Sequence, residues 1–126
     1  MSLFQTGAFI LHSGDPSTFK IDCDALTDAD WAALAKEIAA RVAPFTEVVG
    51  IPRGGLKLAE ALKPYRTQKL GGAFLIVDDV LTTGRSMEEA REEHEKKWSL
   101  ILGAVVFART SIWPWWITPL FEMRGF

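Results

Sequence analysis

Two carboxylates and a hydroxyl-rich loop lie within one short stretch of this chain. Asp78 and Asp79 follow four apolar residues, 74–77, which read F-L-I-V and have the continuous apolar character of a strand buried on both faces. A charged, helix-like run begins at Met87. Between the carboxylates and this run lies a loop made of Leu81, Thr82, Thr83, Gly84, Arg85 and Ser86. The order of residues predicts a strand, a polar loop and a helix.

This arrangement offers two kinds of binding group. A loop that leads into a helix N-terminus presents free backbone N–H groups and the positive end of the helix dipole, which together suit an anion. The two carboxylates suit the hydroxyls of a sugar or a hydrated divalent cation. A phosphate site beside a diol site describes a ribose 5-phosphate. The simpler interpretation is a plain strand–turn–helix in which Asp78 and Asp79 only cap and solvate the strand end.

A second unit of the same kind precedes the first. Residues 46–51 are predicted to form a strand, and residues 56–62 a short helix that Pro64 ends. The loop between them consists of Pro52, Arg53, Gly54 and Gly55. Its glycines let a ligand approach the backbone closely, and the guanidinium fork of Arg53 suits phosphate oxygens. Alone, this loop is a weak signal, because paired glycines occur in many tight strand–helix turns.

The elements around these loops indicate an α/β fold. Thr27 is the predicted N-cap of a helix that runs to about Val42, with an apolar face at helical spacing. Residues 87–98 are predicted to form a charged helix and residues 100–108 another buried strand. In a flavodoxin-like strand order, the strands that precede the two loops are neighbours, and ligands bind beyond their carboxyl ends. We therefore predict a small, mostly parallel, doubly wound sheet with helices on both faces.

The two ends of the chain have their own character. Residues 8–11 and 19–22 indicate two short extended segments. Near the other end, Trp113, Trp115 and Trp116 surround Pro114 and cannot all lie in one regular helix. Three interpretations compete: a final edge strand packed on the sheet, a dimer contact, and an aromatic wall for a base. Core packing with dimer contact is favoured, because large aromatic side chains dominate both settings.

Composition limits the class of protein. The chain has 126 residues, the size of one domain, with 48% hydrophobic and 24% charged residues. A net charge of −2 gives no electrostatic case for nucleic acid or an anionic membrane as the main partner. No apolar run approaches the ~20 residues of a membrane span, and the start lacks the basic region of a secretory signal. A single cysteine, Cys23, favours a reducing compartment and a packing role, so a cytoplasmic protein is expected.

Three stretches carry a resemblance to a known family. F-L-I-V-D-D-V-L-T-T-G-R-S at 74–86 resembles the 5-phosphoribosyl-1-pyrophosphate (PRPP) motif of type I phosphoribosyltransferases. V-V-G-I-P-R-G-G at 48–55 looks like the pyrophosphate loop of the same family. F-I-L-H-S-G-x-x-S-x-F-K-I-D at 9–22 is similar to the N-terminal arm of orotate phosphoribosyltransferases. The resemblance covers about residues 5–110. It implies one domain over 1–126, with a hood at 1–25, a core at 26–110 and an aromatic segment at 111–126.

The resemblance also implies a ligand and a reaction. Asp78 and Asp79 would hold the ribose hydroxyls of PRPP, and Mg²⁺ would bridge those hydroxyls and the pyrophosphate. The loop 81–86 would bind the 5-phosphate, and the loop 52–55, with a cis peptide at Pro52–Arg53, would bind the pyrophosphate. A base nitrogen would then displace the pyrophosphate from the sugar. Relatives of this kind also lead us to expect a homodimer.

The identity of the base depends on fewer residues. His12 and Ser13 in the N-terminal arm and Arg109 after the last core strand are the candidate base-binding residues. His12 replaces the lysine of the related arm, and Ala108 replaces an aspartate before the arginine. Thr82 stands where purine-salvage relatives carry an aspartate as general base. These features favour a pyrimidine such as orotate.

The interval between the two units is short. Only residues 63–72 separate the first helix from the central strand, and relatives use this interval for an edge strand and a mobile loop that closes over PRPP. Ten residues cannot supply both. The alternative function is therefore a non-catalytic PRPP- or nucleotide-binding regulatory module. A general phosphate-binding domain is disfavoured, because neither G-x-x-x-x-G-K-[ST] nor G-x-G-x-x-G is present.

Overall fold

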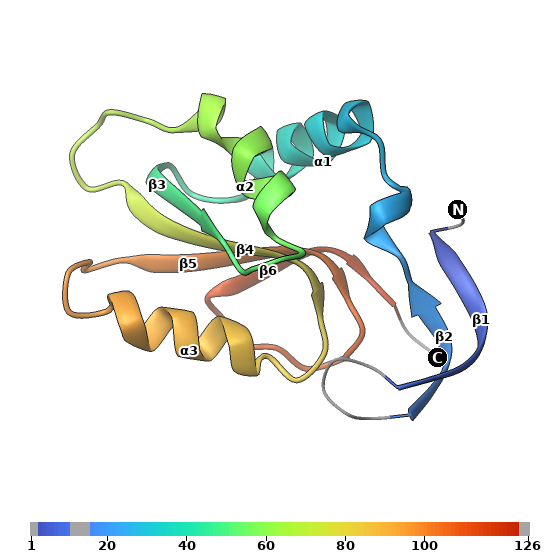
Figure 1. Cartoon of the computed structure of the whole chain (residues 1–126). Coiled ribbons are helices and arrows are strands. Elements are labelled where there is room, and N and C mark those ends of the chain that lie inside the picture. The colour runs from blue at the N-terminus through green and yellow to red at the C-terminus, as the bar shows by residue number, and fades with distance from the viewer. Residues whose placement is uncertain (1–2, 11–15, 124–126) are drawn as a thin grey trace.

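A parallel sheet of four strands forms the centre of the fold (Figure 1). Its strands are β3 (Phe45–Gly50), β4 (Ala73–Leu81), β5 (Ile101–Ala108) and β6 (Ile117–Glu122), paired in that order. The computed structural model describes residues 3–10 and 16–123, with the backbone alone for 6–10 and 16–20. His12 and Ser13 lie outside the described residues. Residues 74–77 of β4 are at most 3% exposed, as their continuous apolar run predicts.

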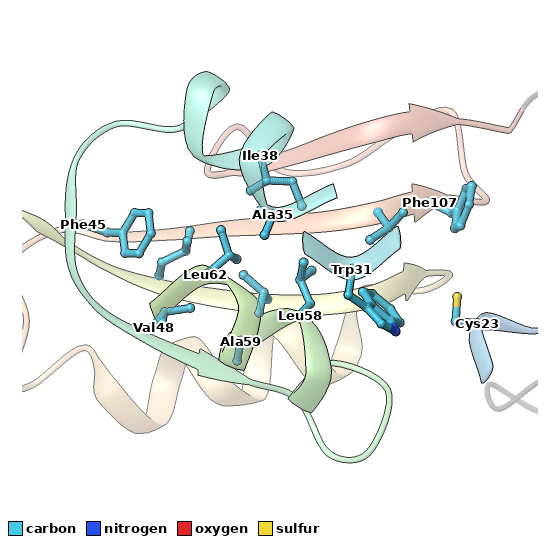
Figure 2. Close-up of a cluster of buried hydrophobic side chains, with 14 of the residues drawn as sticks. Cys23, Trp31, Ala35, Ile38, Phe45, Val48, Leu58, Ala59, Leu62 and Phe107 are labelled. Atoms are coloured by element: carbon cyan, nitrogen blue, oxygen red, sulfur yellow. The ribbon is translucent and has the colours of Figure 1, made fainter. Parts of the chain in front are cut away.

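Helices cover both faces of the sheet. α1 (Asp28–Arg41) and α2 (Leu56–Leu62) lie on one face, and α3 (Arg85–His94) lies on the other (Figure 1). Side chains of β4 alternate accordingly: Leu75 and Val77 pack in the cluster with α1 and α2, whereas Phe74 and Ile76 pack with Met87 of α3. The predicted doubly wound α/β architecture is confirmed. Figure 2 shows the first of these clusters, between the sheet and the two helices.

The start of α1 is fixed by a reciprocal pair of hydrogen bonds. The Asp30 N–H donates to Oγ1 of Thr27 at 3.1 Å, and the Thr27 N–H donates to Oδ2 of Asp30 at 2.8 Å. This capping box satisfies two of the amides that a helix N-terminus leaves without intrahelical partners. It confirms the predicted N-cap.

Replacing Thr27 by alanine is expected to lower the free energy of unfolding by about 1 kcal/mol, because one capping acceptor is lost. Thr27→Ser keeps the acceptor and serves as the control. The measurement is urea unfolding followed by circular dichroism. Identical midpoints for Thr27→Ala and the parent protein would contradict the capping role.

The N-terminal segment forms a separate antiparallel hairpin. β1 (Phe4–Ile10) pairs with β2 (Pro16–Ile21), and a short 3-10 turn, η1 (Cys23–Ala25), leads into α1. Both strands begin earlier in the sequence than predicted. The hairpin is attached to the main fold through Phe4, whose ring meets Phe107 of β5 edge-on at 5.9 Å between centroids.

Two boundaries near the carboxylates differ from the prediction. β4 continues to Leu81, so Asp78 and Asp79 lie within the strand and not after it. The cause is continued pairing with β5, since Asp78 opposes Val105 and Leu81 opposes Ala108. α3 begins at Arg85 and ends at His94, whereas the sequence predicted a helix over residues 87–98. Its N-cap is Gly84, which adopts a left-handed conformation (φ 81°) that favours glycine. Arg85 and Ser86 therefore belong to the first helical turn.

The aromatic C-terminal segment forms β6, which confirms the edge-strand interpretation. Trp116 is 2% exposed, and its Nε1–H donates to Oε1 of Glu88 at 3.2 Å. The Arg91 guanidinium lies 5.2 Å from the centre of the same ring. Ile112 and Trp115, by contrast, are 83% and 76% exposed. One tryptophan is thus part of the core, and a neighbouring one is on the surface.

The connection between α2 and β4 contains a short 3-10 turn, η2 (Lys63–Tyr65), and no strand, as its length predicts. Among the described residues, β3 is therefore an edge strand. The steps from β3 to β4 and from β4 to β5 advance in the same direction across the sheet, yet α2 and α3 lie on opposite faces. The two connections consequently have opposite hands, and one breaks the right-handed rule. A further strand outside β3 would restore the rule, so the sheet formed by the described residues is a doubly wound one without that edge strand.

None of the helices in the described part of the chain combines the length and the apolar character needed to cross a membrane.

Candidate functional site

The two loops predicted to bind phosphate groups lie side by side at the carboxyl ends of β3 and β4. These strands are parallel neighbours, with Gly50 opposite Val77. The pairing continues into the first loop, where the Ile51 N–H donates to the Val77 carbonyl at 2.9 Å. The predicted juxtaposition is confirmed. A ligand at this edge of the sheet can therefore contact both loops.

The first loop, residues 52–55, follows a very tight path. The peptide bond between Pro52 and Arg53 is cis, as the family resemblance implied. A Cβ atom on Gly55 would lie 2.4 Å from the Val77 carbonyl oxygen and 2.7 Å from the Ile51 nitrogen. Only glycine fits this position, because both neighbours are backbone atoms. The loop is thus pressed against the end of β4, with the exposed Arg53 side chain beside it.

Asp79 joins the two loops. A Cβ atom on Gly54 would lie 2.3 Å from Oδ2 and 2.5 Å from Oδ1 of Asp79. The carboxylate therefore lies directly against the backbone of the first loop. Its Oδ1 also accepts a hydrogen bond from the Val80 N–H at 2.7 Å. Gly54 is needed here because any side chain would occupy the space of this carboxylate.

Asp78 is the electrostatically unusual member of the carboxylate pair. Burial, followed by the hydrogen bond and the charge of Asp79, raises the pKa of Asp78 to about 8. Its Oδ1 accepts a hydrogen bond from the Asp79 N–H at 2.8 Å. At neutral pH the carboxyl of Asp78 is therefore largely protonated in the ligand-free protein. Cations or hydroxyl donors placed beside the pair would favour its ionised form.

The second loop, residues 81–86, is anchored at one end and open at the other. Leu81 is buried, and its carbonyl accepts a hydrogen bond from the Arg109 N–H at 2.8 Å. Thr83, Arg85 and Ser86 are exposed, and Oγ1 of Thr83 accepts from the Arg85 N–H at 3.3 Å. The loop thus places hydroxyls and the N-terminal amides of α3 at the solvent boundary, where an anion can reach them.

Arg109 lies at the carboxyl end of β5, next to the second loop. Its backbone bond to Leu81 places it on the same edge of the sheet as the two aspartates. Partial burial lowers the pKa of its guanidinium, which nevertheless stays charged at neutral pH. The structure thus places Arg109 on the same side of the sheet as the carboxylate pair, next to Leu81. The other candidate base-binding residues, His12 and Ser13, lie outside the described residues.

Cys23 lies near the carboxylate pair, a placement that sequence reasoning did not anticipate. It was predicted to be a packing residue, and it is indeed buried in the core, at 7% exposed. Burial, followed by the charge of Asp79, raises the pKa of its thiol. No spacing or motif in the sequence signals this placement, because it depends on how the N-terminal hairpin docks.

The connection between the two units offers little to the site. Nζ of Lys63 lies 2.6 Å from Oε1 of Glu60, and the Arg66 guanidinium lies 3.6 Å from Oε1 of Glu47. Both cations pair with local acids on the surface. The side chain of Leu70 is fully exposed. This short connection has the character of a solvated basic turn.

Comparison with solved structures defines the class of fold. The orotate phosphoribosyltransferase of Aeropyrum pernix aligns with 95% of this chain and 88% of its own, at a TM-score of 0.72 and 20% identity. The alignment with the orotate phosphoribosyltransferase of Mycobacterium tuberculosis H37Rv covers 95% of this chain and 89% of that protein, at a TM-score of 0.70 and 17% identity. A purine phosphoribosyltransferase from Pyrococcus horikoshii aligns less fully, with a TM-score of 0.53. The fold is that of the type I phosphoribosyltransferases.

Comparison of sequences shows which member of this class the chain is similar to. The chain is 29% identical to the orotate phosphoribosyltransferase of Caenorhabditis elegans over 133 aligned residues. The match covers 83% of this chain and 59% of the relative, so the chain spans about three fifths of that protein's length. No protein-family model matches the chain. The resemblance to type I phosphoribosyltransferases, and among them to orotate phosphoribosyltransferase, is confirmed.

Proposed function

We propose that this protein transfers the 5-phosphoribosyl group of PRPP to a nitrogenous base, with orotate as the favoured acceptor, and releases pyrophosphate. The observation that carries the proposal is the contact of Asp79 with Gly54. It supports the proposal because it brings Asp79 against the backbone of the loop 52–55, and a ligand that carries a diol and a pyrophosphate needs its two binding groups close together. The sequence similarity to orotate phosphoribosyltransferase supports the same reaction.

Each part of PRPP has a matching group in the chain. The 5-phosphate binds in the loop 81–86, through its backbone N–H groups and the hydroxyls of Thr83 and Ser86. The ribose hydroxyls donate hydrogen bonds to Asp78 and Asp79. The pyrophosphate binds along the loop 52–55, where the Arg53 fork adds positive charge.

The carboxylate pair also fits a divalent cation. Mg²⁺ in phosphate-binding sites is commonly held by one or two carboxylates together with substrate oxygens and water. Asp78 and Asp79, together with substrate oxygens, are the ligands that we propose; among the described residues, no group of three or more His, Cys, Asp or Glu side chains could hold a metal by itself. When bound, the cation would supply positive charge that stabilises the departing pyrophosphate.

The reaction exchanges one bond at the anomeric carbon for another. The bond from this carbon to the pyrophosphate oxygen breaks, a bond to the base nitrogen forms, and the base nitrogen loses its proton. The protein contributes position and charge: the two carboxylates fix the ribose, and the loop 52–55 receives the leaving pyrophosphate. Arg109 follows the end of β5, and its guanidinium is the proposed partner of the carboxylate of orotate. His12 and Ser13 complete the proposed base site.

Three further properties belong to the proposal. A homodimer is supported by the highly exposed Trp115 and Ile112, since exposed aromatic and aliphatic side chains are typical of interfaces. A cytoplasmic location is supported by the free, buried thiol of Cys23. A hood at 1–25 over a core at 26–110 is supported by the separate two-stranded sheet of the hairpin.

Release of pyrophosphate tests the proposal. The purified protein with Mg²⁺ is expected to release pyrophosphate when PRPP and orotate are both present, and not with either alone. Uracil, which lacks the carboxylate of orotate, is the matched acceptor control and should give little release. A protein carrying both Asp78→Asn and Asp79→Asn, prepared identically, corrects for contaminating enzymes. Release no greater than that of the double variant would overturn the proposed transfer, and PRPP binding without turnover would favour a non-catalytic module.

A further inference from the structure

Trp116 packs against α3, the helix that begins within the loop 81–86. Its side chain is 2% exposed and lies in one cluster with Met87 of α3. Gly103 of β5 leaves the space for both side chains, since a Cβ atom there would lie 2.7 Å from Cε of Met87 and 2.7 Å from Cζ3 of Trp116. Because close packing surrounds the indole ring, its position relative to α3 is fixed.

Glu88 is bonded to this ring. The Trp116 Nε1–H donates to Oε1 of Glu88 at 3.2 Å, and the Arg91 guanidinium lies 5.2 Å from the centre of the same ring. A donor and a cation therefore both lie where α3 contacts the start of β6. Glu88 is the acid in the first turn of α3. The hydrogen bond thus directs the carboxylate of this turn toward β6.

Without that bond, the Glu88 carboxylate would be attracted to the same positive groups that suit a phosphate. One is the N-terminal end of α3, where the N-cap Gly84 supplies no side-chain acceptor. The other is the guanidinium of Arg85, three residues before Glu88 and therefore its neighbour on the helix surface. Among the residues that the structure describes, no acid pairs with Arg85. The first turn stays available to an anion because Glu88 is bonded elsewhere.

We propose that Trp116 is a positioning residue that holds the carboxylate of Glu88 away from the phosphate-binding end of α3. This inference rests on the proposed function, in which the loop 81–86 receives the 5-phosphate of PRPP. Tryptophan suits this role because its indole N–H is a donor only and its ring is fixed by burial. A residue outside both binding loops thus controls the charge that the phosphate meets.

Four variants separate the charge of Glu88 from the packing of Trp116. Glu88→Asp keeps the charge but is shorter by one methylene, so it loses the bond to Trp116 and leaves the core intact. Glu88→Gln keeps an acceptor for the indole N–H and removes the charge. Trp116→Phe removes the donor. The double variant with Trp116→Phe and Glu88→Gln removes the donor and the charge together.

Calorimetric titration of PRPP with Mg²⁺ measures the effect on binding. We expect affinity about two- to fivefold weaker in Glu88→Asp and in Trp116→Phe, the size of one charge acting at a helix N-terminus. Glu88→Gln should bind as tightly as the parent protein. The double variant should regain the parent affinity, although its core carries the same substitution as Trp116→Phe. A purely structural role of Trp116 would not give this recovery.

The amide proton resonances of Arg85 and Ser86 in the ligand-free protein give a second readout. We expect Glu88→Gln to move them more in the Trp116→Phe background than in the parent protein, because the charge approaches the helix N-terminus only when the donor is gone. Equal movements in the two backgrounds would overturn the inference.

The binding data can overturn it in two further ways. One is a double variant that binds PRPP no better than Trp116→Phe, and the other is equal affinity of Glu88→Asp and Glu88→Gln, a comparison that leaves the core unchanged. If the Arg85 and Ser86 resonances move as expected but the parent protein binds no PRPP, the role of Trp116 stands and the proposed function fails.

Discussion

Replacing Gly54 by alanine is expected to reduce kcat/KM for PRPP by roughly a hundredfold or more, while the protein stays folded. The added Cβ would lie 2.3–2.5 Å from the Asp79 carboxylate, so this side chain must rotate away from its position. The atoms that must move are the end of a side chain and not backbone, which is why the fold survives. A misplacement of about 1 Å in a positioning group is enough for a loss of that size.

Two other glycines provide the comparison. Gly55→Ala places its Cβ 2.4 Å from the Val77 carbonyl oxygen, so we expect strong loss of stability in addition to loss of activity. Gly71→Ala meets no atom within 4 Å, and its positive φ of 86° should cost about 1 kcal/mol of stability without altering turnover. Steady-state kinetics and urea unfolding of all three variants distinguish these cases. Turnover by Gly54→Ala within threefold of the parent protein would show that Asp79 does not need its observed position.

The free energy of unfolding is expected to fall as the pH rises from about 5 to 8. The folded protein holds a proton on Asp78 up to a pKa of about 8, whereas an unfolded chain releases it near 3.8. Between these values the folded state binds more protons, so each increase in pH favours unfolding. The stability associated with protonated Asp78 is complete below the unfolded pKa and is lost as the pH passes through about 8. Asp79 is the neighbouring titratable group that acts on it, through its hydrogen bond and its charge.

Asp78→Asn should remove most of this dependence and make the protein more stable at pH 8.5, by on the order of 1–3 kcal/mol. Urea unfolding at a series of pH values from 5.5 to 8.5 measures the effect. Glu89→Gln, an exposed acid on α3, is the control and should leave the slope unchanged. If Asp78→Asn and the parent protein show the same slope, the buried carboxyl is not protonated in the ligand-free fold.

The juxtaposition of the two loops was predictable because it depends on chain order and strand direction. Two successive strand–loop–helix units in a parallel sheet must present their loops at the same edge. The apolar run at 74–77 gave the central strand for the same reason, since it is buried on both faces. Local sequence patterns were sufficient to predict those parts of the structure that depend on a single element or on two neighbouring strands.

Other features depended on contacts that no local pattern encodes. Aspartate is unfavourable in strands, so β4 was expected to end before Asp78, but pairing with β5 extends it to Leu81. The contact of Asp79 with Gly54 joins segments far apart in the sequence. The start of α3 could have been predicted from the sequence, because a glycine before a charged helical run often marks a helix boundary, and Gly84 is the N-cap of this helix.

In the described part of the chain no strand lies outside β3, and this has a consequence for how the molecule behaves at high concentration. An exposed sheet edge usually invites another chain to add a strand, which leads to aggregation. On β3, however, the Val48 N–H is already bonded to Oε1 of Glu47 at 3.1 Å, and the Phe45 carbonyl accepts from the Thr67 N–H at 2.8 Å. Glu47 also places a negative charge there, next to Arg66. The bonded groups and the charge on β3 therefore oppose the addition of a strand from another copy at this edge.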